Sequence, residues 1–171
     1  MKDEQLKIVR EELTAFMERV RENHRRAGQV ASGRTSRSMH VEVDDSEGTV
    51  FGRVAFGTLE TGRKGGNVPR NFREVILQWM KDKGISASPI PYVRKPSEKW
   101  QPKYTPQERG DMSLAGAIAH KIQTSGTKLY RDGGRSDIYS NEIPRTTEAI
   151  MARVLRLFDV EVESINREAK E

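Results

Sequence analysis

The sequence predicts an α+β protein: a small antiparallel sheet packed by amphipathic helices, with long N- and C-terminal helices and a proline-rich extended arm. Three patterns predict this class. Apolar and polar residues alternate in Ser38–Val43 and Thr49–Phe56, they recur at helical spacing in residues 72–80, and they do so again over long spans near both ends of the chain. We expect a single domain over residues 1–171, with residues 86–111 as an extended loop or arm.

The two alternating segments predict a β-hairpin. Each has apolar residues at every second position, which places them on one face of a strand. The segment DDSEG between them is polar and contains Gly48, as expected of a tight turn. We expect this hairpin to nucleate the sheet.

Four segments have the apolar periodicity of amphipathic helices. They are Asp3–Arg26, a segment from about Asn71 to Lys83, Ser113–Ser125 and Glu142–Arg167. In the last of them Leu157–Val162 also alternates like a strand, but a helix accounts for more of the apolar positions. The stripe of the second helix is expected to bury against Val54 and Phe56. Its members are Phe72, Ile76, Trp79 and Met80.

The composition is polar and limits the classes of protein. Hydrophobic residues make up 35% and charged residues 32%, so we expect a modest core and surface stripes that need a partner. The absence of cysteine excludes disulfides and thiolate metal sites. The charged start MKDEQ and the lack of a long apolar run predict a soluble protein made in a cytoplasm, without a membrane partner.

Motifs that carry chemistry are weak. The glycines of ETGRKGGN suggest a phosphate loop, but Lys64 precedes Gly65 and Gly66 and no hydroxyl residue follows them, so a flexible turn is favoured. Asp44–Asp45 has the character of a solvated turn. For Glu60, which precedes a basic loop, a salt bridge to Arg63 is favoured over general-base chemistry.

No arrangement of nucleophile, base or metal ligand stands out. His120 has no second ligand at metal-binding spacing, and Ser38 with His40 would share a strand face without a residue to orient them. No G-x-S-x-G element is present. We therefore expect no enzyme activity, no catalytic, cofactor-binding or metal-binding residues, and no cofactor.

The net charge of +5 also allows a nucleic-acid-binding module as an alternative. Tyr92, Trp100 and Tyr104 lie among Lys and Arg residues, and aromatic rings between basic residues can stack bases and grip a phosphate backbone. Basic residues also flank a polar loop near residues 25–37. No recognition helix, zinc finger or RNP pattern accompanies them, so surfaces facing solvent or protein are favoured.

Several soft motifs occur in a recognisable order. Gly33-Arg34-x-x-x-Ser38 precedes the hairpin, which leads into Leu59-Glu60-x-Gly62-Arg63. A Gly/Pro loop follows, then the helix of Trp79 with its Lys83-Gly84-Ile85 end, then an Ala-rich helix ending Ile122-x-x-x-Gly126-Thr127-Lys128-Leu129-Tyr130. Over roughly residues 30–135 this order resembles the tail-completion, minor tail or head–tail joining proteins of the tailed-bacteriophage neck. The long proline-rich insertion departs from their compact pattern.

The resemblance implies a structural virion protein at the head–tail junction, acting as a tail-completion or head–tail joining subunit of a homo-oligomeric ring. A tail terminator that caps the tail tube is the alternative within this class. The implied partners are head-closure or adaptor proteins and tail-tube or terminator proteins, with DNA passing through the lumen. The implied location is the virion tail or neck, and the host cytoplasm during assembly. The residues expected at protein interfaces are Arg63, Lys64, Tyr92, Trp100 and Tyr104.

Overall fold

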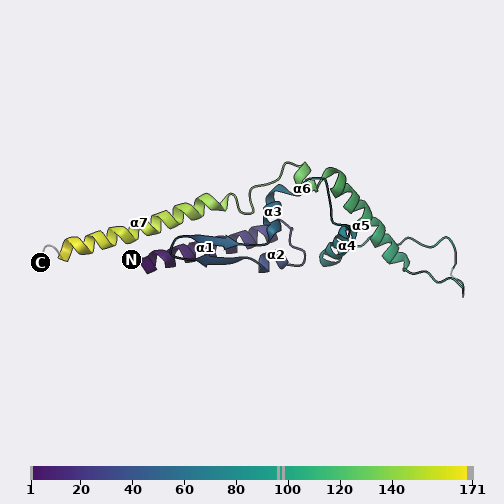
Figure 1. The fold of residues 1–171 in the computed structure, drawn as a ribbon, viewed down its shortest axis with the longest axis horizontal. Coiled ribbons are helices and arrows are strands. Elements are labelled where there is room, and N and C mark those ends of the chain that lie inside the picture. The colour runs from purple at the N-terminus through teal and green to yellow at the C-terminus, as the bar shows by residue number, and fades with distance from the viewer. Residues whose placement is uncertain (1, 96, 98, 169–171) are drawn as a thin grey trace. The chain divides into compact units, whose positions relative to one another are not determined.

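The computed structural model describes residues 2–95, 97 and 99–168. This part of the chain is mostly helical, with one two-stranded antiparallel sheet (Figure 1). Two compact units emerge: unit 1 combines residues 1–60 with 135–171, and unit 2 comprises residues 61–134. The elements in chain order are α1 (Lys2–Arg26), α2 (Arg34–Arg37), β1 (His40–Val43), β2 (Gly48–Phe51), η1 (Val54–Gly57), α3 (Thr58–Thr61), α4 (Phe72–Lys83), α5 (Pro106–Ser125), α6 (Lys128–Arg131) and α7 (Glu142–Glu168).

The predicted hairpin in unit 1 is confirmed, but its second strand is shorter than expected. His40 pairs with Phe51 and Val43 with Gly48. The chain then turns into the short helices η1 and α3 instead of continuing as a strand to Phe56. The turn folds the ring of Phe56 back over Gly52, whose missing side chain leaves room for it.

The core of unit 1 lies between α1, the hairpin and the segment that precedes α7. Its buried members are Met17, Val20, Met39 and Ile138. A Cβ on Gly48 would lie 2.6 Å from Cγ1 of Val9 and 2.7 Å from Cδ1 of Leu13. Glycine at the start of β2 therefore lets the hairpin lie close against α1.

The two long terminal helices are confirmed, and they pack together as an antiparallel pair in unit 1. Arg153 of α7 forms ion pairs with Glu11 and Glu12 near the start of α1, at 2.6 and 2.9 Å. Arg19, further along α1, pairs with Glu142 at the start of α7 at 2.7 Å. The alternative of a strand within Leu157–Val162 is wrong, since α7 is continuous there.

Unit 2 is built on α4 packed against α5. Its buried cluster joins Ile76 and Met80 of α4 to Ala115 of α5. The expectation that α4 buries against Val54 and Phe56 is wrong, because the core cluster around α4 is formed with α5. Trp79 is not a core residue either.

The packing of α4 on α5 explains why Trp79 does not lie in the core as expected. Ala115 has only a methyl side chain, so it allows α4 to approach α5 at Met80, which is 1% exposed. Trp79 lies about 100° round the helix from Met80. Its side chain stays 37% exposed.

Helix α5 begins seven residues before the predicted Ser113. Thr105 caps it: its hydroxyl accepts from the Glu108 N–H at 3.2 Å, and the Glu108 carboxylate accepts from the Thr105 N–H at 2.7 Å. Pro106 occupies the first helical turn, where its missing N–H costs nothing. This capping box shortens the arm to residues 86–105.

Three one-turn α-helices lie outside the four segments predicted as helices: α2 in the basic connector, α3 before the glycine-rich turn, and α6 after α5. The hydroxyl of Thr127 caps α6 by accepting from the Tyr130 N–H at 3.3 Å. Helices this short depend on their caps and neighbours, and their sequences carry no periodic signal.

Candidate interaction surfaces

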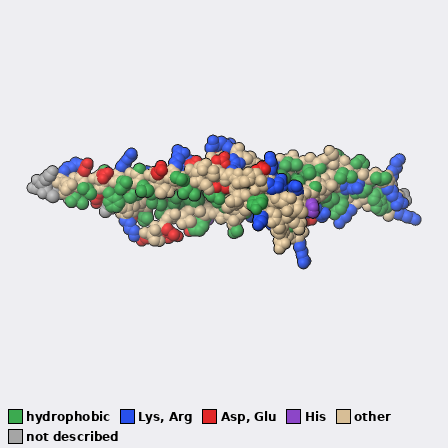
Figure 2. All heavy atoms as spheres, turned by 90° about the horizontal axis from the view of Figure 1, so that it is seen from above, with side chains coloured by type: hydrophobic (Ala, Val, Ile, Leu, Met, Phe, Trp, Pro, Cys, Tyr) green, Lys and Arg blue, Asp and Glu red, His purple; other side chains and the backbone are tan. Residues whose placement is uncertain are grey.

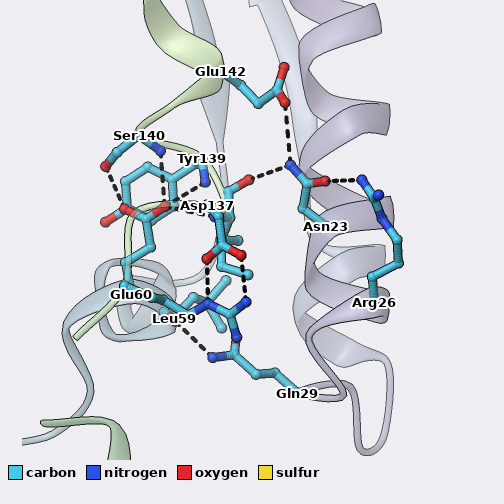
Figure 3. A network of polar contacts seen from close by, with 11 residues as sticks. Asn23, Arg26, Gln29, Leu59, Glu60, Asp137, Tyr139, Ser140 and Glu142 are labelled. Atoms are coloured by element: carbon cyan, nitrogen blue, oxygen red, sulfur yellow. Dashed lines mark hydrogen bonds and ion pairs between the residues drawn. The ribbon is translucent and has the colours of Figure 1, made fainter. Parts of the chain in front are cut away.

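Glu60 of α3 is a buried carboxylate, 3% exposed, at the point where α7 is positioned (Figure 3). Its Oε1 accepts hydrogen bonds from the backbone N–H groups of Ile138, Tyr139 and Ser140, at 2.9, 2.7 and 3.0 Å. Its Oε2 accepts a hydrogen bond from the Ser140 hydroxyl. These four donors make Glu60 a cap for the turn that leads into α7, and not the salt-bridge partner of Arg63 that was expected.

The charge of Glu60 is stabilised by these donors. Burial alone would raise the pKa of the Glu60 carboxyl, but the hydrogen bonds from Ser140, Tyr139 and Ile138 outweigh it, and the net pKa lies below its usual value. Close by, the Arg135 N–H donates to the Glu60 backbone carbonyl at 2.9 Å. The points where the chain leaves and re-enters unit 1 are therefore hydrogen-bonded to each other.

Arg63 and Lys64, both expected at an interface, lie in a turn of unit 2. The Arg63 N–H donates to the Thr127 hydroxyl at 2.9 Å, and the Thr127 N–H donates to the Arg63 carbonyl at 2.9 Å. The Arg63 guanidinium donates to the Asn67 carbonyl at 2.6 Å and lies over the Phe72 ring. Arg63 thus holds the fold of its own unit, while the Lys64 side chain is exposed.

Three glycines allow this turn to meet the end of α5 backbone to backbone. A Cβ on Gly62 would lie 2.5 Å from the Tyr130 nitrogen, and one on Gly126 would lie 2.6 Å from the Arg63 carbonyl oxygen. Gly65 is also tightly approached, with the Thr124 carbonyl oxygen 3.0 Å from its Cβ position. The motifs ETGRKGG and SGTKLY are therefore contact partners, and the turn is fixed instead of flexible as predicted.

The three arm aromatics expected at an interface lie together. The Tyr92 ring meets the Trp100 ring edge-on at 5.5 Å, and its hydroxyl donates to the Tyr104 carbonyl at 2.7 Å. The Arg109 guanidinium lies 4.1 Å from the Tyr92 ring centroid. Tyr92 is thereby engaged within the arm, whereas Trp100 and Tyr104 are each 38% exposed.

The arm is anchored on α5 of its own chain. The Ala87 N–H donates to the Asp111 carboxylate at 2.7 Å, which is the main reason that the pKa of this carboxyl lies below its usual value. A Cβ on Gly110 would lie 2.2 Å from the Ser88 carbonyl oxygen, so only glycine admits the arm there. The base of the arm therefore has hydrogen-bonding partners within its own chain.

The outward face of α7 carries an apolar stripe that the described part of the chain leaves uncovered. Its members are Met151, Leu155, Phe158, Val162 and Ile165, which are 42–60% exposed. Figure 2 shows apolar side chains gathered along the surface formed by α7. The spacing of four and three residues in alternation is that of a helix made to pack against another element.

The sequence suggested a single broad stripe on α7, and the structure divides it in two. Ile150, Val154 and Leu157 are half-buried on the side of α7 that carries the ion pair of Arg153 with α1. The other apolar residues face away. The sequence could have indicated this second face. The apolar positions of α7 spread over more of the helix circumference than one neighbouring helix can cover.

Unit 2 carries an apolar groove of about 550 Å³, which sequence reasoning missed. Its apolar lining comes from Ile76, Trp79, Ile118, Ile122 and Leu129. Its charged lining residues are all basic: Lys121, Lys128 and Arg131. These residues come from α4, α5, α6 and the connection between α5 and α6, so no single sequence pattern could indicate the groove.

Comparison with models of protein families, with curated proteins and with solved structures finds no match. Among the residues that the structure describes, no group of three or more His, Cys, Asp or Glu side chains is placed to hold a metal ion. Within the same residues, every helix is too short or too polar to cross a membrane.

Proposed function

We propose that this chain is a structural virion protein of a tailed bacteriophage, joining or finishing the tail at the neck as a subunit of a homo-oligomeric ring. Its partners in this role are a head-closure or adaptor protein on one side and a tail-tube or terminator protein on the other. It acts by binding and not by catalysis.

The observation that carries the proposal is the exposed stripe of α7. Five large apolar side chains in a regular row on a well-packed helix cost free energy in water, so they favour a role in which a neighbour covers them. A ring gives every copy such a neighbour. Only 35% of the residues are hydrophobic, and five large hydrophobic residues form this one exposed row.

The contact between ETGRKGG and SGTKLY adds support of another kind. These motifs carry much of the resemblance to neck proteins. They are joined across about sixty residues of chain by hydrogen bonds between Arg63 and Thr127 and by the close approaches at three glycines. Motifs that meet in space belong to one structural device, so their co-occurrence has a physical basis. Lys64 lies exposed in this turn, and Trp100 and Tyr104 lie exposed in the arm that precedes α5; these three remain the proposed contact residues.

The experiment that tests the proposal is electron microscopy of phage particles made without this protein. We expect filled heads and separate tails of normal length, with joining restored when the protein is supplied in trans. A supplied Phe158→Asp protein should fail to restore it, whereas Val160→Asp, which changes an exposed residue on the side of α7 opposite the stripe, should succeed. Intact heads already joined to working tails would refute the proposal.

The tail-terminator alternative makes a different prediction in the same images. A protein that caps the tube limits its growth, so its loss should give tails of irregular and excessive length. Tail length distributions measured on the same grids therefore separate the two roles.

A nucleic-acid-binding module is the second candidate, and the arm is the observation that favours it. Arg94, Lys95, Lys99 and Lys103 are exposed around the ring cluster of the arm. A DNA-binding arm should show an affinity that falls steeply with salt, with a slope that reports several phosphate contacts. Weak binding with a shallow slope would leave the arm as a protein-binding element.

A further inference from the structure

The uncovered stripe of α7 and the groove of unit 2 have complementary chemistry. We propose that α7 of one copy docks its Leu155–Ile165 segment into the unit 2 groove of a second copy. This inference rests on the proposed ring function and names the contact that builds the ring. The proposed contact joins two copies of the chain. Each copy contributes its α7 to one neighbour and its unit 2 groove to another.

Shape is the first argument. From Met151 to Ile165 the stripe extends about 21 Å along a continuous helix, at 1.5 Å per residue. Ion pairs from Arg153 to Glu11 and Glu12 hold α7 against α1 immediately before the Leu155–Ile165 segment, which continues as part of the same helix. An amphipathic helix lying in an apolar groove is an established mode of recognition, with anchors at the spacing seen here.

Charge is the second argument, and it selects the occupant. Over the docked segment Leu155–Ile165 the helix carries three acidic residues, Asp159, Glu161 and Glu163, against one basic residue, Arg156, and it is therefore acidic overall. The groove has the opposite character, since its charged lining residues are two lysines and one arginine. Lys121 and Lys128 are exposed, and no ion pair joins either of them to another residue that the structure describes.

The same charges disfavour a parallel pairing of α7 with α7 of another copy. Such a parallel pair would bring the two acidic segments from Asp159 to Glu163 together along one apolar seam. Like charges placed across an interface oppose association, whereas opposite charges on its rim fix the register. The groove of unit 2 supplies the missing positive charge.

The symmetry of the contact also matches a ring. Helix and groove are different surfaces, so the contact is heterologous and each copy can bind one neighbour on either side. Repeated contacts of this kind close into a ring or continue as a filament. An α7–α7 contact would instead be isologous and stop at a dimer.

The test uses the full-length chain and two variants, one that disrupts the helix side of the contact and one that disrupts the groove side. Phe158→Asp interrupts the stripe, and the double change Lys121→Glu with Lys128→Glu reverses the groove rim. Native mass spectrometry and light scattering should find each variant monomeric where the wild type forms rings, with a Kd for self-association at least about tenfold weaker. Val160→Asp is the matched control on α7 and should assemble normally, and circular dichroism checks that all variants fold.

Mixing the two variants gives the decisive reading. Phe158→Asp retains a working groove and the groove variant retains a working helix, so an equimolar mixture should form heterodimers and no rings. Rings that persist in the groove variant, or a wild type that stays monomeric at high concentration, would overturn the inference. Phage particles made without the protein test the ring function separately. If their heads and tails are unjoined while the groove variant still forms rings, the proposed function is retained and the helix–groove contact is rejected.

Discussion

The two units hold distant parts of the chain together by different means. In unit 1 a single buried side chain, Glu60, gathers three backbone N–H groups and a hydroxyl from residues 138–140. In unit 2 glycines let the backbones of residues 62–66 and 123–130 meet directly, and the Thr127 hydroxyl accepts one further hydrogen bond from the Arg63 N–H. The first junction depends on one charge, and the second on the absence of Cβ atoms.

The difference decides how each junction can fail. A junction made by a carboxylate responds to loss of charge, and therefore to pH. A junction made by close backbone approach is indifferent to charge and sensitive to any added atom. Four predictions separate the units on this basis, in descending order of expected effect.

The largest effect is expected in the core of unit 2. Met80→Ala should lower the free energy of unfolding by about 3–4 kcal/mol, because Met80 is 1% exposed between α4 and α5. Trp79→Ala, the neighbouring control, should cost about 1 kcal/mol, since its side chain already faces solvent. Urea unfolding measures both, and equal losses for the two variants would contradict the assignment of Met80 to the core.

Glu60→Ala should lower the free energy of unfolding by about 3 kcal/mol, since three backbone donors lose their acceptor. Hydrogen exchange should localise the effect, with faster exchange at Ile138, Tyr139 and Ser140. Exchange in α4 should be unchanged if the junctions are separate. Unprotected amides at residues 138–140 in the wild type would show that this cap does not form.

Gly62→Ala should cost about 2 kcal/mol more than Gly133→Ala. Both glycines have a left-handed φ, of +69° and +88°, so both variants pay that strain, but only the Gly62 position is crowded by backbone. Thermal unfolding of the pair isolates the cost of the added atom. Equal melting temperatures would mean that the turn is not packed against α6.

The smallest effect is the pH response of the Glu60 junction. Because the pKa of folded Glu60 is depressed, its contribution is fully present above the ordinary carboxyl pKa of about 4.3 and is lost as pH falls through the lower folded value. Glu60→Gln should therefore flatten the fall in stability below about pH 4.3. Glu11, Asp44, Asp111 and Asp137 also have depressed pKa values and should supply the slope that remains.

Sequence periodicity predicted the elements that have a regular apolar stripe or alternation. The hairpin, the terminal helices and α4 all belong to this group. It failed where a single contact decides the outcome, as with the Thr105 and Glu108 capping box that starts α5 early. Periodicity predicted the helix α4 itself but not its packing partner. An apolar stripe shows that one face of a helix is buried, and it does not identify the element that covers this face.

The candidate surfaces divide in the same way. The arm aromatics and the basic turn were found from residue type, although Arg63 and Tyr92 prove to be engaged within their own unit. Glu60 was noticed for its unusual position, but its partners lie about eighty residues away and no local pattern links them. The groove of unit 2 needs α4, α5 and α6 to be assembled before it exists.

The interleaved order of the units has a consequence for synthesis. Unit 1 is closed by α7, yet residues 61–134 must be made before α7 begins. At 5–20 residues per second this is a delay of roughly 4–15 s, during which α1 and the hairpin lack the helix that completes them. Unit 2 is contiguous and can fold as it emerges. A nascent chain can thus form the groove of unit 2 before the stripe of α7 exists. Under the proposed contact, a growing subunit could receive a neighbour's helix before it can offer its own.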